Sequence, residues 1–152
     1  MDGVIYRGNQ LIPGADTFIN GLRERGIPYL FLTNNSQRTR RDVAHKLRKL
    51  GIDATEDDVF TCAMATARFL ANQTPNGTAY VIGENGLVNA LHRNGYTIAD
   101  EDVDYVVVGW DRELSWQKLA AATRLIYGGA VFVGTNPDRT FPMKAGLAPG
   151  NG

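Results

Sequence analysis

The 152-residue sequence has few side chains that could form disulfides or bind transition metals. It contains one cysteine, Cys62, and two histidines, His45 and His92. A single cysteine excludes an internal disulfide and is typical of a reducing compartment. No motif places either histidine near Cys62, so we interpret this cysteine as a small buried apolar residue rather than a metal ligand or nucleophile.

The chain also lacks net charge and long apolar runs. Sixteen basic residues balance sixteen acidic ones, so no overall field attracts nucleic acid or an anionic membrane. No stretch approaches the roughly 20 apolar residues of a membrane helix, and the N-terminus has no hydrophobic signal core. We therefore expect a soluble cytoplasmic protein that binds neither nucleic acid nor membrane, and any anion site must be local.

The most informative stretch is residues 29–36, Tyr-Leu-Phe-Leu-Thr-Asn-Asn-Ser. Four apolar residues followed by small polar ones predict a buried parallel strand that ends at Thr33. In open α/β sheets, ligands bind beyond the carboxyl ends of the strands. Hydroxyl and amide groups that suit phosphate follow this strand, on Thr33, Asn34, Asn35 and Ser36. Alternatively, these residues only turn the chain and cap the next helix.

Strand and helix patterns alternate along the whole chain. We expect a small hairpin around Gly8-Asn9, strands at residues 29–33, 59–60, 79–82, 96–98, 105–108 and 131–134, and helices at 13–25, 39–50, 61–70, 84–93 and 115–127. Residues 135–142 and 146–152 read as loops. This alternation predicts an α/β fold with parallel sheets.

Residues 73–77, Gln-Thr-Pro-Asn-Gly, form the best candidate linker, because proline and Asn-Gly both interrupt regular structure. This linker divides the chain into two α/β lobes, residues 1–76 and 77–152.

Two further patterns favour ordinary structural roles. The basic residues between positions 38 and 49 could bind nucleic acid, but a solvated helix face explains them as well. Gly83-Glu84-Asn85-Gly86 is similar to a phosphate-binding turn, yet it lacks the dinucleotide spacing, and Glu84 would repel phosphate.

Three segments together are more specific than any of these patterns. They are Met-Asp-Gly-Val at residues 1–4, Leu-Thr-Asn-Asn-Ser at 32–36, and Gly-Thr-Asn-Pro-Asp at 134–138 with Phe-Pro and Gly-Leu-Ala-Pro-Gly after it. The set resembles the haloacid dehalogenase-like phosphatases. It is most similar to the subgroup with a large α/β cap of the C2 type, which includes p-nitrophenyl, phosphoglycolate and pyridoxal phosphatases. The resemblance implies part of a Rossmann-like parallel-sheet core at residues 1–76 and an incomplete cap at 77–152.

The resemblance also implies a site and a reaction. In the family, two aspartates in an Asp-x-Asp-Gly loop hydrolyse a small phosphorylated metabolite through an aspartyl-phosphate. Asp2 matches the second aspartate, which protonates the leaving oxygen and later activates water, and whose backbone carbonyl binds Mg²⁺. Thr33 and Asn34 match the residues that bind the phosphate oxygens, while Asn35 supports the loop or the substrate. The loop at residues 136–141 would help to choose the substrate.

The sequence departs from the family pattern at both ends. The nucleophilic aspartate would precede Met1, and the phosphate-neutralising lysine and final Mg²⁺-binding aspartates would follow Gly152; Lys144 does not match the lysine motif. We therefore expect a portion of a phosphatase with little or no turnover by itself, whose uncovered sheet edge favours aggregation or homodimer formation. A non-catalytic module that binds phosphorylated ligands is the alternative, whereas a nucleotide-binding Rossmann domain would need a Gly-x-Gly-x-x-Gly motif that is missing here.

Overall fold

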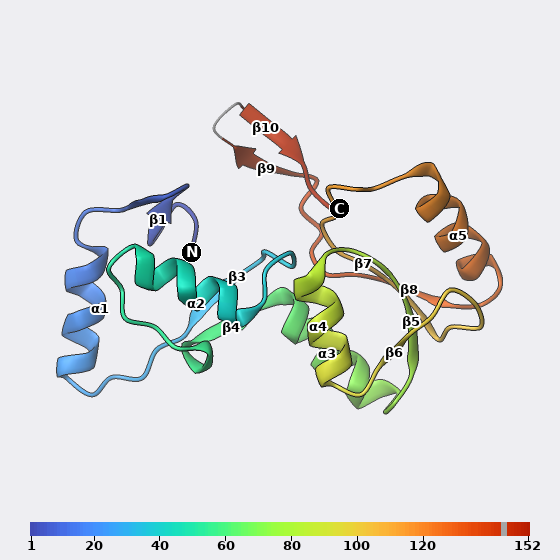
Figure 1. Ribbon diagram of the computed structural model, residues 1–152, viewed down its shortest axis with the longest axis horizontal. Helices are drawn as coiled ribbons and strands as arrows, with labels where there is room; N and C mark the ends of the chain where they lie inside the picture. The colour runs from blue at the N-terminus through green and yellow to red at the C-terminus, as the bar shows by residue number, and fades with distance from the viewer. Residues whose placement is uncertain (144–145) are drawn as a thin grey trace. The chain divides into compact units, whose positions relative to one another are not determined.

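The computed structural model describes residues 1–143 and 146–152, so Lys144 lies outside the described residues. The chain forms two compact units (Figure 1). The first consists of residues 1–33 and 40–61, and the second of residues 34–39 and 62–152. Both combine helices with parallel strands, which confirms the predicted α/β class.

The first unit begins with the predicted hairpin, in which β1 (Tyr6–Arg7) pairs antiparallel with β2 (Gln10–Leu11). Gly8 makes the turn with φ of 58°, a conformation that glycine adopts without steric cost. Helix α1 (Ala15–Glu24) follows.

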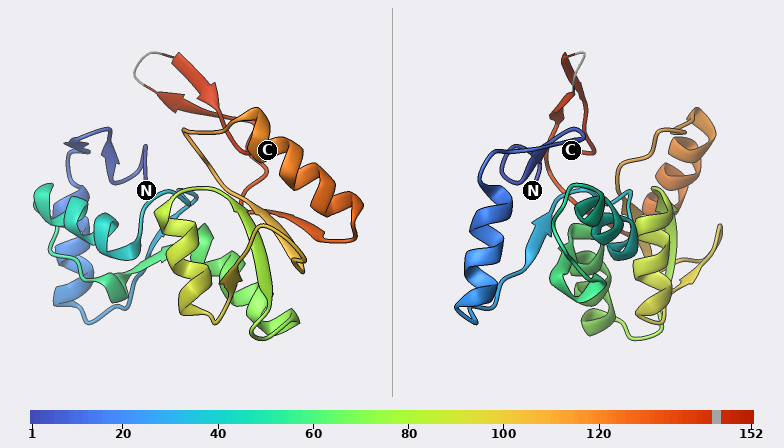
Figure 2. Two further views of the ribbon diagram at one scale, coloured as in Figure 1. Left: turned by 45° about the vertical axis from the view of Figure 1, so that its right-hand side comes forward. Right: turned by 60° about the vertical axis from the view of Figure 1, so that its left-hand side comes forward.

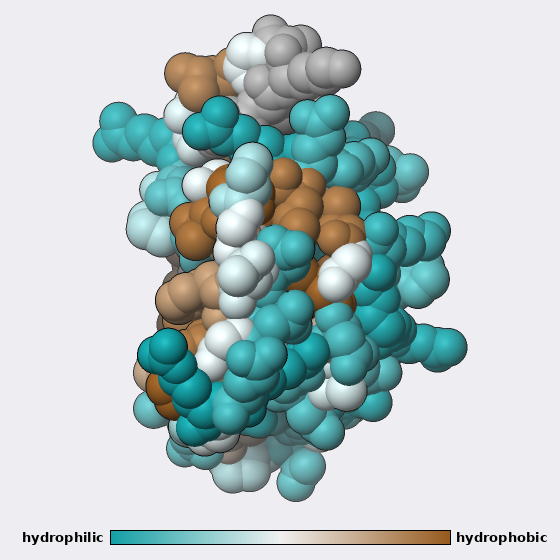
Figure 3. All heavy atoms as spheres, turned by 90° about the vertical axis from the view of Figure 1, so that its left-hand side faces the viewer, coloured by the Kyte–Doolittle hydropathy of each residue, from teal (hydrophilic) through white to brown (hydrophobic). Residues whose placement is uncertain are grey.

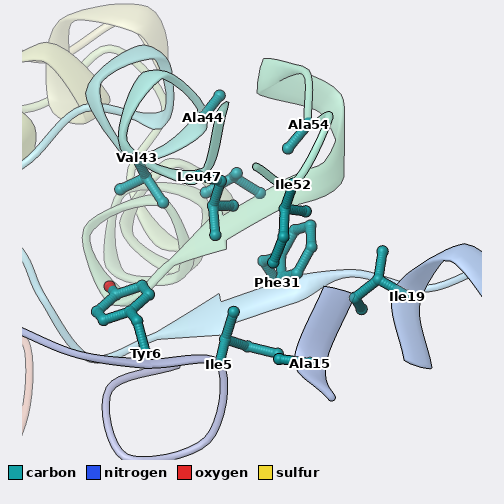
Figure 4. Close-up of a cluster of buried hydrophobic side chains, with 11 residues drawn as sticks. Ile5, Tyr6, Ala15, Ile19, Phe31, Val43, Ala44, Leu47, Ile52 and Ala54 are labelled. Atoms are coloured by element: carbon teal, nitrogen blue, oxygen red, sulfur yellow. The ribbon is translucent and has the colours of Figure 1, made fainter. Parts of the chain in front are cut away.

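A parallel pair of strands and a helix form the centre of the first unit. Strand β3 (Phe31–Thr33) pairs with β4 (Val59–Thr61), and α2 (Arg40–Lys49) and the short 3₁₀ helix η1 (Glu56–Asp58) connect them. Leu47 of α2 is fully buried, and its side chain lies in one cluster with Phe31 and Ile52 (Figure 4). Its burial removes apolar surface from water, which is the main stabilising effect in a core of this size.

The predicted burial of β3 holds for one face of the strand only. Phe31 is 3% exposed, but Leu30 and Leu32 are 57% and 61% exposed. Successive side chains of a strand point to opposite faces, so the core cluster covers only the face that carries Phe31. The side of the molecule with α1 accordingly shows apolar surface (Figure 3). The large exposed apolar residues of this unit are Val4, Phe18, Ile27, Leu30 and Leu32.

The second unit is a four-stranded parallel sheet in the order β6-β5-β7-β8. Its strands are β5 (Thr78–Ile82), β6 (Thr97–Ile98), β7 (Tyr105–Val108) and β8 (Val131–Gly134). Helices α3 (Cys62–Gln73) and α4 (Asn85–Arg93) cover one face, and α5 (Trp116–Tyr127) covers the other (Figures 1 and 2).

Alternating side chains of the central strands explain this layering. Ala79 and Val107 belong to the cluster that contains the buried residues of α3 and α4. Ile82 and Val106 instead pack with Ala122 of α5. Both faces of β5 and β7 are therefore apolar, as expected for parallel strands between two layers of helices.

The chain ends in an antiparallel hairpin of β9 (Thr140–Met143) and β10 (Gly146–Pro149). The prediction of loops at 135–142 and 146–152 is wrong for these residues. Pro142 and Pro149 both occupy paired positions in this hairpin, Pro142 opposite Leu147 and Pro149 opposite Thr140. In a two-stranded hairpin, alternate N–H groups of each strand point away from the other strand and make no hydrogen bond with it. Proline, which has no N–H group, can therefore occupy those positions.

Apart from residues 34–39, the compact units divide the chain between Thr61 and Cys62, whereas the sequence placed the lobe boundary at residue 76. Helix α3 belongs to the second unit because its buried residues pack against α4. The functional division into core and cap stays a prediction.

Candidate functional site

Asp2 and Thr33 lie in the first unit. The amino group of Met1 donates a hydrogen bond of 3.2 Å to the Leu32 carbonyl, so the start of the chain lies at the carboxyl end of β3. Asp2 directly follows Met1, and Thr33 directly follows Leu32, so both residues lie next to this hydrogen bond. Asp2 is exposed and its Oδ1 accepts a 3.0 Å hydrogen bond from the Gly3 N–H, while Thr33 is half-buried.

Asn34 packs within the second unit. Its Nδ2 donates to Oδ2 of Asp138 at 3.4 Å, and its carbonyl accepts from Sγ of Cys62 at 3.0 Å. Asp138 belongs to the segment that the sequence singled out as a substrate-reading loop. The second unit thus brings one predicted phosphate ligand together with that segment.

Asn35 has a local structural role. Its Oδ1 accepts hydrogen bonds from the backbone N–H groups of Gln37 (2.8 Å) and Arg38 (3.3 Å). An asparagine side chain that bonds the backbone two residues ahead holds a turn in place. Of the two roles that the family resemblance allows, this geometry supports the loop role.

Ser36 does not present its hydroxyl to a ligand. It is 2% exposed, and its Oγ accepts a 3.0 Å hydrogen bond from the backbone N–H of Trp110. The polar residues after β3 therefore divide into exposed Asn34 and Asn35 and the buried anchor Ser36.

Glu84 is a residue whose partners the sequence analysis missed. Its carboxylate accepts hydrogen bonds from Nε (2.8 Å) and Nη2 (2.9 Å) of Arg112 and from Nε2 of Gln37 (2.8 Å). The hydrogen bonds from Arg112 lower the pKa of Glu84, burial opposes them, and the bond from Gln37 adds to them. Its engagement agrees with the interpretation that residues 83–86 do not cradle phosphate. No spacing rule connects residues 37, 84 and 112, so the sequence carried no signal for this cluster.

Cys62 is half-buried, less than the sequence suggested. Burial raises the pKa of its thiol, and hydrogen bonds, including one with Thr135, oppose the rise only in part. The protonated thiol agrees with its hydrogen bond to the Asn34 carbonyl. Because the thiolate is the nucleophilic form, this environment favours an inert cysteine.

Comparison with known families identifies the chain. The family model for haloacid dehalogenase-like hydrolases matches residues 1–97. The chain belongs to this family.

Among curated haloacid dehalogenase-like relatives, 5'-nucleotidase YutF of Bacillus subtilis is 47% identical over 152 residues, and the acid sugar phosphatase of Staphylococcus aureus strain USA300 is 46% identical over 153. Both alignments cover 100% of this chain and 59% of the relative. The solved p-nitrophenyl phosphatase from Archaeoglobus fulgidus has a TM-score of 0.92 at 37% identity, covering 99% of this chain and 58% of that one. The chain thus spans about three fifths of its relatives' length.

Asp2, which the family resemblance predicts as a magnesium ligand, is exposed at the start of the chain. Its carboxylate and carbonyl oxygens are the hard donors that Mg²⁺ prefers, and such sites often use one or two carboxylates with water and substrate phosphate. Residues 1–143 and 146–152 contain no group of three or more histidine, cysteine, aspartate or glutamate residues that could hold a metal. A magnesium ion held by Asp2 would therefore need further oxygen ligands.

None of the helices in the described part of the chain is both long enough and apolar enough to cross a membrane.

Proposed function

We propose that this chain contributes to a Mg²⁺-dependent phosphatase that hydrolyses small phosphate monoesters. The observation that carries the proposal is the placement of Asp2 and Thr33 at the carboxyl end of β3, next to the Met1–Leu32 hydrogen bond. In α/β sheets this end of the strands is where ligands bind. In this proposal residues 1–76 supply part of the core and residues 77–152 part of the cap.

The proposed site residues have distinct tasks. The Thr33 hydroxyl and the Asn34 amide donate hydrogen bonds to phosphate oxygens. Asp2 donates a proton to the leaving oxygen as the phosphorus–oxygen bond breaks, and it later accepts a proton from the water that attacks phosphorus. Asn35 holds the turn behind Asn34.

The first bond to phosphorus would come from an aspartate carboxylate, which the family resemblance places immediately before Met1, to give an aspartyl-phosphate. Magnesium, bound in part through Asp2, would offset the repulsion between this carboxylate and the phosphate dianion. We expect the 152 residues to have little or no activity without that nucleophile.

The proposed substrate is a small phosphorylated metabolite in the cytoplasm. The names of the relatives support the class, since they include a 5'-nucleotidase, an acid sugar phosphatase and a p-nitrophenyl phosphatase. The contact between Asn34 and Asp138 supports a role for residues 136–141 in substrate choice. Exposed Leu30 and Leu32 of the first unit are compatible with a homodimer.

A non-catalytic module that binds phosphorylated ligands is the second candidate. Such a module would use the same Thr33 hydroxyl and Asn34 amide to bind phosphate without a nucleophile. Binding without hydrolysis separates it from the phosphatase.

Hydrolysis of p-nitrophenyl phosphate tests the proposal. The assay compares the 152-residue chain with a polypeptide extended at both ends to the length of its relatives, each with Mg²⁺ and with a chelator. We expect Mg²⁺-dependent turnover by the extended polypeptide, a loss of at least about 100-fold in its Asp2→Asn variant, and unchanged turnover in Asp53→Asn, which removes an 86% exposed carboxylate of the same unit. Equal rates in the presence of chelator, or full activity of Asp2→Asn, would contradict the mechanism.

A further inference from the structure

Residues 36–38, directly after Asn34 and Asn35, are anchored to two turns of the second unit. One turn joins β5 to α4, and next to it the N–H of Gly86, in the first turn of α4, donates a 2.9 Å hydrogen bond to the Gln37 carbonyl. The other follows β7, and its Trp110 N–H donates to Oγ of Ser36 at 3.0 Å. All of these residues belong to the second unit.

Two glycines allow this close approach. A β-carbon at Gly86 would lie 2.5 Å from the Ser36 carbonyl oxygen, and one at Gly109 would lie 2.7 Å from the Ser36 Oγ. Both distances are too short for carbon and oxygen atoms that are not bonded to each other. The backbone of residues 36–38 thus lies directly against the two turns.

Glu84 adds a charged group to these anchors. Its Oε2 accepts hydrogen bonds from both Gln37 and Arg112, and its Oε1 accepts from Arg112. The Glu84 side chain is only 20% exposed, whereas Arg112 is 64% exposed. Arg112 therefore covers Glu84 from the solvent side. Gln37 connects Glu84 to the loop after β3.

We propose that Glu84 is a positioning residue for phosphate binding, an inference that rests on the function proposed above. Glu84 holds the Gln37 side chain, and the Gln37 backbone N–H is bonded to Oδ1 of Asn35. Through this chain of contacts Glu84 fixes the turn that presents Asn34. A loop ordered in advance loses less conformational entropy when its ligand binds, so affinity rises.

Amide hydrogen exchange on the 152-residue chain tests the contact without any ligand. The amide protons of Gln37 and Arg38, both bonded to Asn35, should exchange at least about threefold faster in Glu84→Ala. Gln37→Ala removes the same hydrogen bond by deleting its donor. It should accelerate exchange of the Arg38 amide as much as Glu84→Ala does. The variant that carries both substitutions should show no further increase. Arg112→Ala leaves the Glu84–Gln37 bond and is the matched control, with a smaller effect.

Steady-state kinetics of the extended polypeptide tests the consequence. Glu84→Ala and Gln37→Ala should raise KM for p-nitrophenyl phosphate by about tenfold, the size expected for one charge-assisted hydrogen bond, and leave kcat within about twofold. A residue that only stabilises the fold would lower Tm but not change KM well below Tm. Glu84→Gln should recover part of the affinity, because its side-chain oxygen can still accept from Gln37.

The two proposals fail in different ways. Unchanged exchange at residues 37 and 38, or an unchanged KM in an active Glu84→Ala protein, would overturn the positioning role. Absence of turnover in the unsubstituted extended polypeptide would overturn the phosphatase assignment, and exchange alone would then decide whether Glu84 orders the loop.

Discussion

Hydrogen bonds from Arg112 and Gln37 favour the charged form of Glu84. They therefore lower the pKa of its carboxyl group below the ordinary value of 4.5 in the folded protein. A group whose pKa is lower when folded contributes stability above its unfolded pKa, and this contribution disappears as the pH falls through the folded value. Glu84 should thus stabilise the protein at neutral pH and lose this effect in acid.

We predict that the free energy of unfolding falls less steeply in Glu84→Gln than in the unsubstituted chain as the pH decreases below 4.5. Urea unfolding at a series of pH values measures this slope. Glu101→Gln, which changes an exposed glutamate, should keep the original slope. Parallel curves for all three proteins would show that Glu84 does not contribute in this way.

Cys62 gives a second prediction at the residue scale. Burial raises its thiol pKa above the ordinary value of 9.0, so the thiolate that reacts with alkylating reagents is scarce at about pH 8. We expect iodoacetamide to modify folded Cys62 at least about tenfold more slowly than the urea-unfolded chain. Equal rates in the two states would contradict the described environment.

The sequence predicted candidate site residues around the end of β3, but it did not predict which side chains hold the following loop in place. The family motifs pointed to Asp2, Thr33 and Asn34 without any coordinates. The contact of Glu84 with Gln37 spans 47 positions and depends on how two βα turns pack, which no local pattern encodes. For the same reason the sequence left open whether Ser36 binds a ligand or only turns the chain, and the structure shows its hydroxyl bonded within the protein.

The elements of the first unit are held in place by single faces of apolar side chains. In the first unit, α2 buries Leu47 completely, while Leu30 next to β3 remains 57% exposed. The two side chains are identical, but Leu47 is buried and Leu30 is exposed to solvent.

Leu47→Ala should therefore lower the free energy of unfolding by about 2–5 kcal/mol, because it removes buried methyl groups and leaves a cavity. Leu30→Ala should change it by less than about 1 kcal/mol. Denaturant unfolding of both variants measures the difference. Similar losses would mean that the core of the first unit does not have the described arrangement.

Substitution by alanine should have opposite effects on stability at two glycines in helices. Gly21 lies within α1, and a β-carbon added there would meet no atom within 4 Å. Gly21→Ala should therefore stabilise the chain by about 0.5–1 kcal/mol. Gly86→Ala should destabilise it despite the same gain in helix propensity, since its methyl group would collide with the Ser36 carbonyl oxygen. Thermal unfolding compares them, and a stabilised Gly86→Ala would refute the close packing of residues 36–38.

Helices and parallel strands followed from the sequence because apolar periodicity and helix-ending glycines are local signals. Four consecutive apolar residues do not show whether one or both faces of β3 are covered, and only the expected uncovered sheet edge indicated exposed apolar side chains. The β9–β10 hairpin was missed because the polar residues of 135–142 and the glycines and Pro149 of 146–152 are typical of loops. A two-stranded hairpin has outer edges that accept proline.

At the scale of the whole molecule, the alternation of strands and helices predicted the α/β class, and three short motifs predicted the family that the match over residues 1–97 supports. The boundary between the compact units was not predictable from Pro and Gly content. It depends on α3, which packs with α4 of the second unit, and helix packing partners leave no local signature.

Titration with inorganic phosphate tests the central claim most directly, namely that phosphate binds where the start of the chain meets the end of β3. The measurement is the ¹⁵N–¹H shift of each backbone amide of the 152-residue chain in Mg²⁺-containing buffer. We predict saturable shifts centred on Thr33 and Asn34 that weaken in Thr33→Val but persist in Thr97→Val, which changes an exposed threonine of β6. Shifts that are absent at residues 33 and 34, or that survive Thr33→Val unchanged, would contradict the account.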